Sequence, residues 1–116
     1  MICEYLKDWT AQQVFDKVAK HLLTQDARSQ EGTACLYRGP NGLMCAAGCL
    51  IPDADYYGSL EGANWNSLVD RAEVPVEHHA LIQTLQQVHD IRLPCVWLES
   101  LSNIAGEFGL NTEVLQ

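Results

Sequence analysis

Cysteine is the residue type in this 116-residue sequence with the widest choice of chemistry, and Cys45 is the best candidate nucleophile. It follows a predicted turn and precedes a run of small residues that could begin a helix, where the helix dipole would lower the pKa of its thiol. A thiol nucleophile also needs a base, and His89 lies on the apolar flank of a predicted helix. Cys45 and His89 would together make a thiol-dependent enzyme, an alternative that stands beside ordinary packing roles for both side chains.

Cys45 and Cys49 also have the spacing of half a metal site. Three residues separate them, within the range of about two to four found in structural zinc sites. A second close pair is missing, because His78 and His79 are adjacent and would point in different directions on a helix. We therefore expect no metal and no other cofactor, and a zinc-stabilised module built on Cys45 and Cys49 stays open as an alternative.

The rest of the sequence narrows the class of protein. The five cysteines are an odd number in a chain whose N-terminus lacks the basic start and apolar run of a secretory signal, so we expect reduced thiols and a cytoplasmic protein. No stretch approaches the roughly 18 consecutive apolar residues of a membrane span. The motifs of P-loop enzymes, dinucleotide-binding folds, serine hydrolases and zinc metalloproteases are absent, which disfavours those enzymes.

Acidic side chains are concentrated in one region. The chain carries 15 acidic and seven basic residues, and this negative charge opposes direct nucleic-acid binding. Residues 53–77 hold six acidic side chains against Arg71 alone, interleaved with Tyr56, Tyr57 and Trp65. Charge steers the approach of a basic partner and aromatic side chains supply buried contact area. The predicted partner-binding residues are Asp53, Asp55, Tyr56, Tyr57, Glu61, Asp70 and Glu73.

Two other interpretations of this region stay open. The acidic residues could simply form a solvated surface while the aromatic rings turn into the core. Asp53 and Asp55 could hold a divalent cation, although the other ligands of an EF-hand loop are missing.

The elements that would position these residues are predicted from local patterns. Thr10 and Gln13 form a capping box that begins a helix, and apolar residues of helical period carry it from Ala11 to Gln25. A strand over residues 34–38, a turn over 39–42 and an antiparallel return over 43–45 make a hairpin. Residues 45–51 suit either a buried strand or a tight helical turn, and both are open.

Three further helices follow. Asn64 caps a short helix, a longer one has its apolar face at residues 81–89, and Pro94 opens the last, which Gly109 ends. Residues 111–116 are expected to fray. The predicted architecture is α+β: one domain over residues 1–116, with four helices packed around a short antiparallel hairpin.

The block from Cys35 to Asp53, CLYRGPNGLMCAAGCLIPD, resembles a family of small proteins of bacteria and their phages to which no activity is assigned. The Glu61–Gly62 pair and the Phe-Gly-Leu sequence at 108–110 match the same group. The resemblance implies a small accessory protein carried by phages or mobile elements. Proteins of that setting are often inhibitors of host defence, including anti-CRISPR proteins.

These observations converge on a non-enzymatic interaction protein. It would bind and inhibit a bacterial nucleic-acid-handling or defence complex through its acidic, aromatic-bearing region. The partner would be a bacterial protein or ribonucleoprotein with a basic surface. An exposed hairpin edge could add a strand from a second copy, which leaves a homodimer open.

Overall fold

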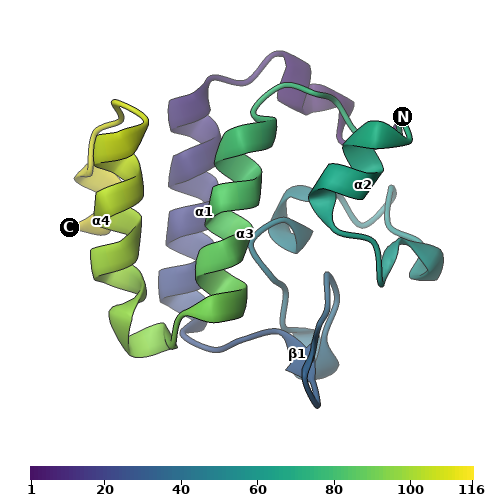
Figure 1. The fold of residues 1–116 in the computed structure, drawn as a ribbon, viewed down its shortest axis with the longest axis horizontal. Coiled ribbons are helices and arrows are strands. Elements are labelled where there is room, and N and C mark those ends of the chain that lie inside the picture. The colour runs from purple at the N-terminus through teal and green to yellow at the C-terminus, as the bar shows by residue number, and fades with distance from the viewer.

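The computed structural model describes residues 1–116 and has three helices side by side as its main layer (Figure 1). These are α1 (Ala11–Gln25), α3 (His79–Ile91) and α4 (Trp97–Glu107), and each contacts the other two. The short helix α2 (Trp65–Asp70) packs against α3 on the side away from α4. With one two-stranded antiparallel sheet, the chain has the predicted α+β architecture.

Helix α1 begins where the capping box predicts. The hydroxyl of Thr10 accepts a hydrogen bond from the backbone N–H of Gln13 at 3.1 Å, and the Gln13 side chain accepts one from the N–H of Thr10 at 2.8 Å. These bonds satisfy two of the N–H groups that every helix start leaves without an intrahelical partner. The apolar face of α1 is buried at Val14, Phe15 and Val18 among others, so the predicted periodicity is confirmed.

The structure contains one β-hairpin, which lies earlier in the chain than predicted. Its strands are β1 (Gln30–Glu31) and β2 (Ala34–Cys35), and the turn passes through Gly32 at φ +60°. The predicted turn over 39–42 contains a 3-10 turn over Pro40–Gly42, and residues 43–45 do not return as a strand.

Two polar side chains from other segments explain this difference. Glu61 accepts hydrogen bonds from the backbone N–H groups of Tyr37 and Arg38 at 2.9 and 3.0 Å. The hydroxyl of Ser29 lies 2.7 Å from the carbonyl oxygen of Leu36 and 3.2 Å from that of Leu43. Backbone groups that a 34–38/43–45 ladder would use are therefore paired elsewhere.

The segment 45–51 forms a helical turn, which decides between the two alternatives left by the sequence. Its centre is a 3-10 turn over Gly48–Leu50 packed against the backbone of Tyr37. A Cβ atom on Gly48 would lie 2.3 Å from the Tyr37 carbonyl oxygen, so only glycine fits. The small residue Gly48 thus allows the backbones of this segment and of Tyr37 to lie in direct contact.

The C-terminal elements mostly follow prediction. Asn64 caps α2 through a hydrogen bond from the N–H of Ser67, and Gly109 follows α4 with φ +67°. The expected fraying of residues 111–116 is wrong, because Val114 and Leu115 pack against the core and the 3-10 turn Glu113–Leu115 contacts α1.

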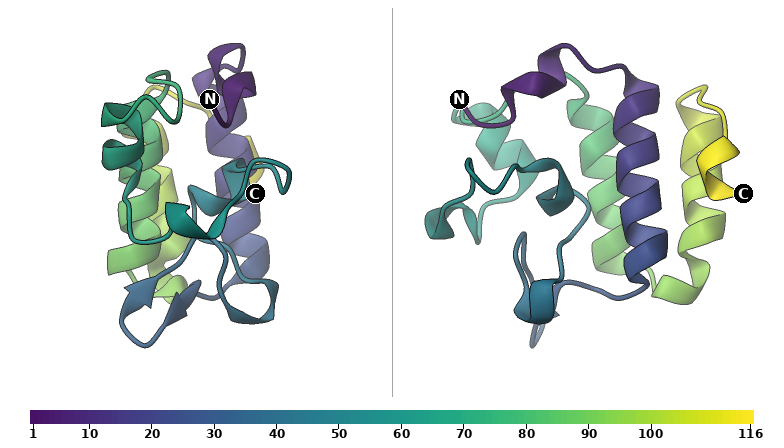
Figure 2. Two further views of the ribbon diagram at one scale, coloured as in Figure 1. Left: turned by 90° about the vertical axis from the view of Figure 1, so that its right-hand side faces the viewer. Right: turned by 180° about the vertical axis from the view of Figure 1, so that it is seen from behind.

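Residues 36–64 carry little regular structure and cover one side of the helical layer (Figure 2). The N-terminus lies near α2, whereas the C-terminus lies beside α4 at the opposite side of the molecule (Figure 1). None of the helices has the length and apolar character that crossing a bilayer would require.

Candidate functional site

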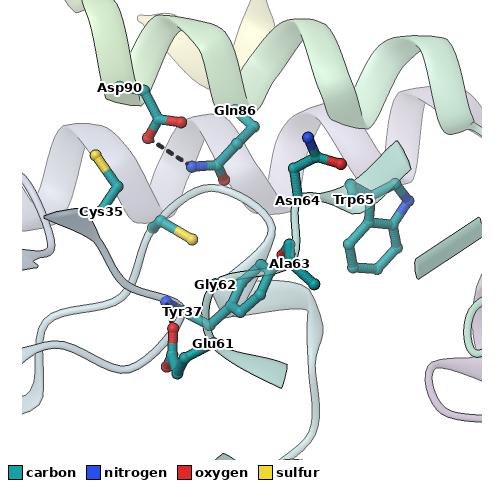
Figure 3. A pocket seen from close by; sticks show the side chains of 10 residues that line it. Cys35, Tyr37, Glu61, Gly62, Ala63, Asn64, Trp65, Gln86 and Asp90 are labelled. Carbon is teal, nitrogen blue, oxygen red and sulfur yellow. Dashed lines mark hydrogen bonds between the residues drawn. The ribbon is translucent and has the colours of Figure 1, made fainter. Parts of the chain in front are cut away.

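A cavity of about 180 Å³ lies between the end of β2, the 61–65 segment and the C-terminal half of α3 (Figure 3). Figure 3 shows Asp90 and Gln86 entering it from α3, with Tyr37 and Glu61 on the opposite side. Its walls are formed by Cys35, Tyr37, Cys45, Glu61, Gly62, Ala63, Asn64, Trp65, Gln86 and Asp90.

Asp90 is the centre of a hydrogen-bond network beside this cavity. Its carboxylate accepts bonds from His89 Nδ1 at 2.8 Å and from the Gln86 amide at 2.7 Å, and the Cys35 sulfur lies within 4.8 Å of it. Burial alone would raise the pKa of Asp90, but the donors outweigh burial and hold that pKa below its usual value. The carboxylate is therefore ionised at neutral pH.

His89 has both ring nitrogens engaged. Nε2 lies 2.8 Å from the backbone N–H of Ser29, which can only donate, so Nε2 must accept and the ring proton must sit on Nδ1. Nδ1 then donates to Asp90. The ring is fully buried and stacks on Trp97 with 5.7 Å between centroids. A base needs a free nitrogen lone pair that reaches the nucleophile, and His89 has none to offer.

Cys45 is not the activated thiol that its position suggested. Only 2% of it is exposed, and burial raises the pKa of its thiol far above the ordinary value. The N–H of Gly48 bonds the sulfur at 3.2 Å and opposes this shift, but desolvation is the larger effect. The predicted lowering of the Cys45 pKa by a helix N-terminus is therefore wrong.

Cys35 and Asp90 are two polar residues of this cavity that the sequence analysis does not single out. Burial and the Asp90 carboxylate raise the pKa of the Cys35 thiol to about 11, so the thiolate is scarce at neutral pH. The adjacent pair His89–Asp90 is the one sequence feature that could have indicated a polar network at this cavity.

Cys35, His89 and Asp90 could be read as a metal site, because their ligand atoms all lie within 4.8 Å of one another. The Ser29 bond argues against it. It requires the Nε2 lone pair, so a metal on Nδ1 would need a fully deprotonated imidazole. His89 and Asp90 already bond to each other, to Ser29 and to Gln86, and this hydrogen-bond network suits them better than a metal does.

Arg38 organises the other candidate region, the acidic one. Its guanidinium donates to the carbonyl oxygens of Gly48 and Ile51 at 2.6 and 2.7 Å, and to Asp53 at 3.1 Å. It also lies over the Tyr56 ring, 5.0 Å from the centroid. One side chain thus fixes the course of the chain through the first part of this region.

Several of the predicted partner-binding carboxylates hold the fold together. Asp55 accepts a hydrogen bond from the N–H of Cys3 at 3.0 Å, and Glu61 accepts one from the Tyr56 hydroxyl at 2.8 Å besides its two backbone bonds. Glu73 accepts one from the Tyr57 hydroxyl at 2.5 Å.

The other acidic residues of the region face solvent. The Asp53 side chain is fully exposed at 100%, and Asp70 and Glu77 are exposed as well. Tyr57 is 41% exposed, whereas Trp65 is buried in the core and offers no surface anchor. We call residues 53–77 the acidic lobe; α2 and the loop before it lie at the side of the molecule away from α4 (Figures 1 and 2).

No protein-family model, curated protein or solved structure matches this chain. The resemblance of the Cys35–Asp53 block to small bacterial and phage proteins stays a prediction.

Proposed function

We propose that the protein is a non-enzymatic interaction protein whose acidic lobe binds the basic, nucleic-acid-binding surface of a bacterial protein or ribonucleoprotein complex and inhibits that complex. The observation that carries the proposal is how the lobe's carboxylates are held. Asp55 and Glu61 are bonded by neutral N–H and O–H donors, which fix their position without cancelling their charge.

Cations reduce the charge of the lobe only in part. Arg38 pairs with Asp53 and Arg71 lies 3.8 Å from Glu73, while Asp70 and Glu77 have no ion-pair partner. The lobe therefore combines fixed negative charge with exposed carboxylates and one half-exposed tyrosine ring. Charge of this kind accelerates and orients the encounter with a basic surface, as phosphates do.

The structure also divides the lobe into two classes of residue. Asp55 and Glu61 support the fold, so reversing their charge would disturb the structure as well as any interface. Asp53, Tyr57 and Asp70 are the members of the predicted set that can contact a partner without unfolding the loop.

The test is a pull-down from bacterial lysate with three proteins. They are the wild type, a lobe variant (Asp53→Lys, Asp70→Lys, Glu77→Lys) and a control with the same charge change near α4 (Glu99→Lys, Glu107→Lys, Glu113→Lys), where all three residues are exposed. A partner should be retained by the wild type and the control and lost with the lobe variant. Added double-stranded DNA or RNA should release it.

The control makes the result specific to the lobe. Equal loss in both variants would show that net charge alone causes capture, and a partner that nucleic acid does not release would have no nucleic-acid surface in the contact. Either result rules out the proposed function. Matching thermal midpoints for all three proteins would show that the fold is unchanged.

A further inference from the structure

A second concave surface, separate from the acidic lobe, lies between α1 and the segment 42–44. This open groove has a volume of about 640 Å³. Lys17, Lys20, His21 and Thr24 line it from α1 at helical spacings of three and four residues, which places them along one face. The other lining residues are Gln25, Gly42, Leu43, Met44 and Cys49.

The groove contains two cationic groups, the ammonium groups of Lys17 and Lys20, that form no hydrogen bond or ion pair within the protein. Neither Lys17 nor Lys20 forms an ion pair, whereas Lys7, Arg38 and Arg71 each lie beside a carboxylate. Lys17 makes only a distant contact with the Trp9 ring, at 5.9 Å. The chain has a net charge of −8, so two unpaired lysines in one groove give that groove a positive charge on an otherwise acidic protein.

The Cys49 thiol reports the positive field inside the groove. Burial raises its pKa to about 12, while Lys17 and Arg38 both act to lower it. Lys17 and Arg38 are therefore both close enough to this wall to act on the thiol, although burial remains the larger effect.

The wall opposite the lysines is held in place. The backbone of Met44 bonds to the Gln25 side chain at 2.8 and 3.0 Å and to His21 Nε2 at 2.8 Å. Burial lowers the pKa of His21, so its ring is neutral and serves as a support. Leu43 and Met44 line this wall and give it an apolar part that suits a ring. The Met44 sulfur also accepts a bond from the Arg38 guanidinium at 3.2 Å, which holds that side chain in place.

The carboxylates of the cavity beside Asp90, in contrast, already have hydrogen-bond partners within the protein. Asp90 and Glu61 together accept bonds from several donors within the chain. The groove has unsatisfied donors and more than three times the volume, and is within the size range of small-molecule sites.

We propose that this groove binds a small phosphate ester of a ring compound, with the phosphate between the ammonium groups of Lys17 and Lys20 and the ring against Leu43 and Met44. Two ammonium groups and the Thr24 hydroxyl suit the charge and the several oxygens of a phosphate. A groove of this volume exceeds what phosphate alone would fill.

The probe is AMP, titrated into the ¹⁵N-labelled protein and followed by backbone amide shifts. Saturable shifts are expected at residues 17–25 and 42–49, with a dissociation constant of about 1 mM or below. Adenosine, which lacks the phosphate, should bind at least about tenfold more weakly. Absence of saturation with AMP, saturable shifts confined to another surface, or equal binding of adenosine would each overturn the proposal.

Lysine variants distinguish AMP binding in the groove from attraction of AMP by positive charge elsewhere on the protein. Lys17→Gln with Lys20→Gln should weaken AMP binding about tenfold or more. Lys7→Gln makes one such change outside the groove, at a lysine paired with Glu4, and should leave AMP binding unchanged. The three lysines are exposed, so equal thermal midpoints are expected. Unchanged AMP affinity in the double variant would refute the phosphate site.

Discussion

The carboxylate of Glu61 accepts a hydrogen bond from the backbone N–H of Arg38 at 3.0 Å, across 23 positions of sequence. The same carboxylate binds the N–H of Tyr37 and the hydroxyl of Tyr56. It therefore ties the acidic lobe to the chain that leaves β2, and it places Arg38 where its guanidinium can reach Gly48 and Asp53. The lobe and the segment 37–53 are stabilised as one unit.

Glu61→Ala should therefore destabilise the protein far more than loss of an ordinary surface carboxylate. Two backbone N–H groups and one hydroxyl would lose their acceptor. Each half-buried donor left without an acceptor costs about 1 kcal/mol, so we expect the free energy of unfolding to fall by about 3 kcal/mol. Urea denaturation measures it. Glu77→Ala is the control, since Glu77 is exposed and unpaired, and should change stability by less than about 0.5 kcal/mol.

Gly48→Ala should be strongly destabilising. The new Cβ would lie 2.3 Å from the Tyr37 carbonyl oxygen, so the backbone must move apart, at a cost of about 3 kcal/mol. Gly106→Ala on α4 is a matched control, because nothing lies within 4 Å of its added Cβ. That substitution should be neutral or stabilise by about 0.5–1 kcal/mol, since alanine favours helix. A Gly48→Ala protein as stable as the wild type would contradict the close approach.

Alkylation should distinguish the five thiols. Cys95 is exposed and should react first with iodoacetamide, whereas Cys45 is buried and should be protected until the protein unfolds. Burial and Asp90 raise the pKa of Cys35 to about 11, so its labelling should stay slow at pH 9 and rise only as the pH approaches that value. Peptide mass spectrometry follows each site. Rapid native labelling of Cys45 at pH 7 would restore the case for a thiol enzyme.

Stability in acid should depend on Asp90. The pKa of Asp90 is lower in the folded protein than its ordinary value of 3.8, so the contribution of the carboxylate is complete above about pH 5 and is lost as pH falls through the folded pKa. The free energy of unfolding should therefore fall less steeply below pH 4 in Asp90→Asn than in the wild type. Asp70→Asn, at an exposed site, should keep the wild-type slope. Identical slopes for wild type and Asp90→Asn would be inconsistent with the network around His89.

The features that the sequence predicts correctly depend on interactions between residues close together in the chain. The start of α1 at Thr10, the cap of α2 at Asn64 and the end of α4 at Gly109 follow from side chains that bond within three residues and from backbone preferences of single residues. Helical periodicity predicted the buried faces of α1 and α3 for the same reason. The concentration of acidic residues in 53–77 is likewise a property of composition.

Tertiary structure decided the hairpin and the roles of the polar side chains. Ser29 and His89 are 60 positions apart, and the bond between them fixes the ring tautomer. Glu61 takes the N–H groups that the predicted 34–38 strand would have used in its ladder. The sequence alone determined the four α-helices and where charge accumulates. Which carboxylates support the fold, which thiols are buried and which lysines share a groove depended on contacts between distant segments, because burial and hydrogen bonding there arise only when the chain is folded.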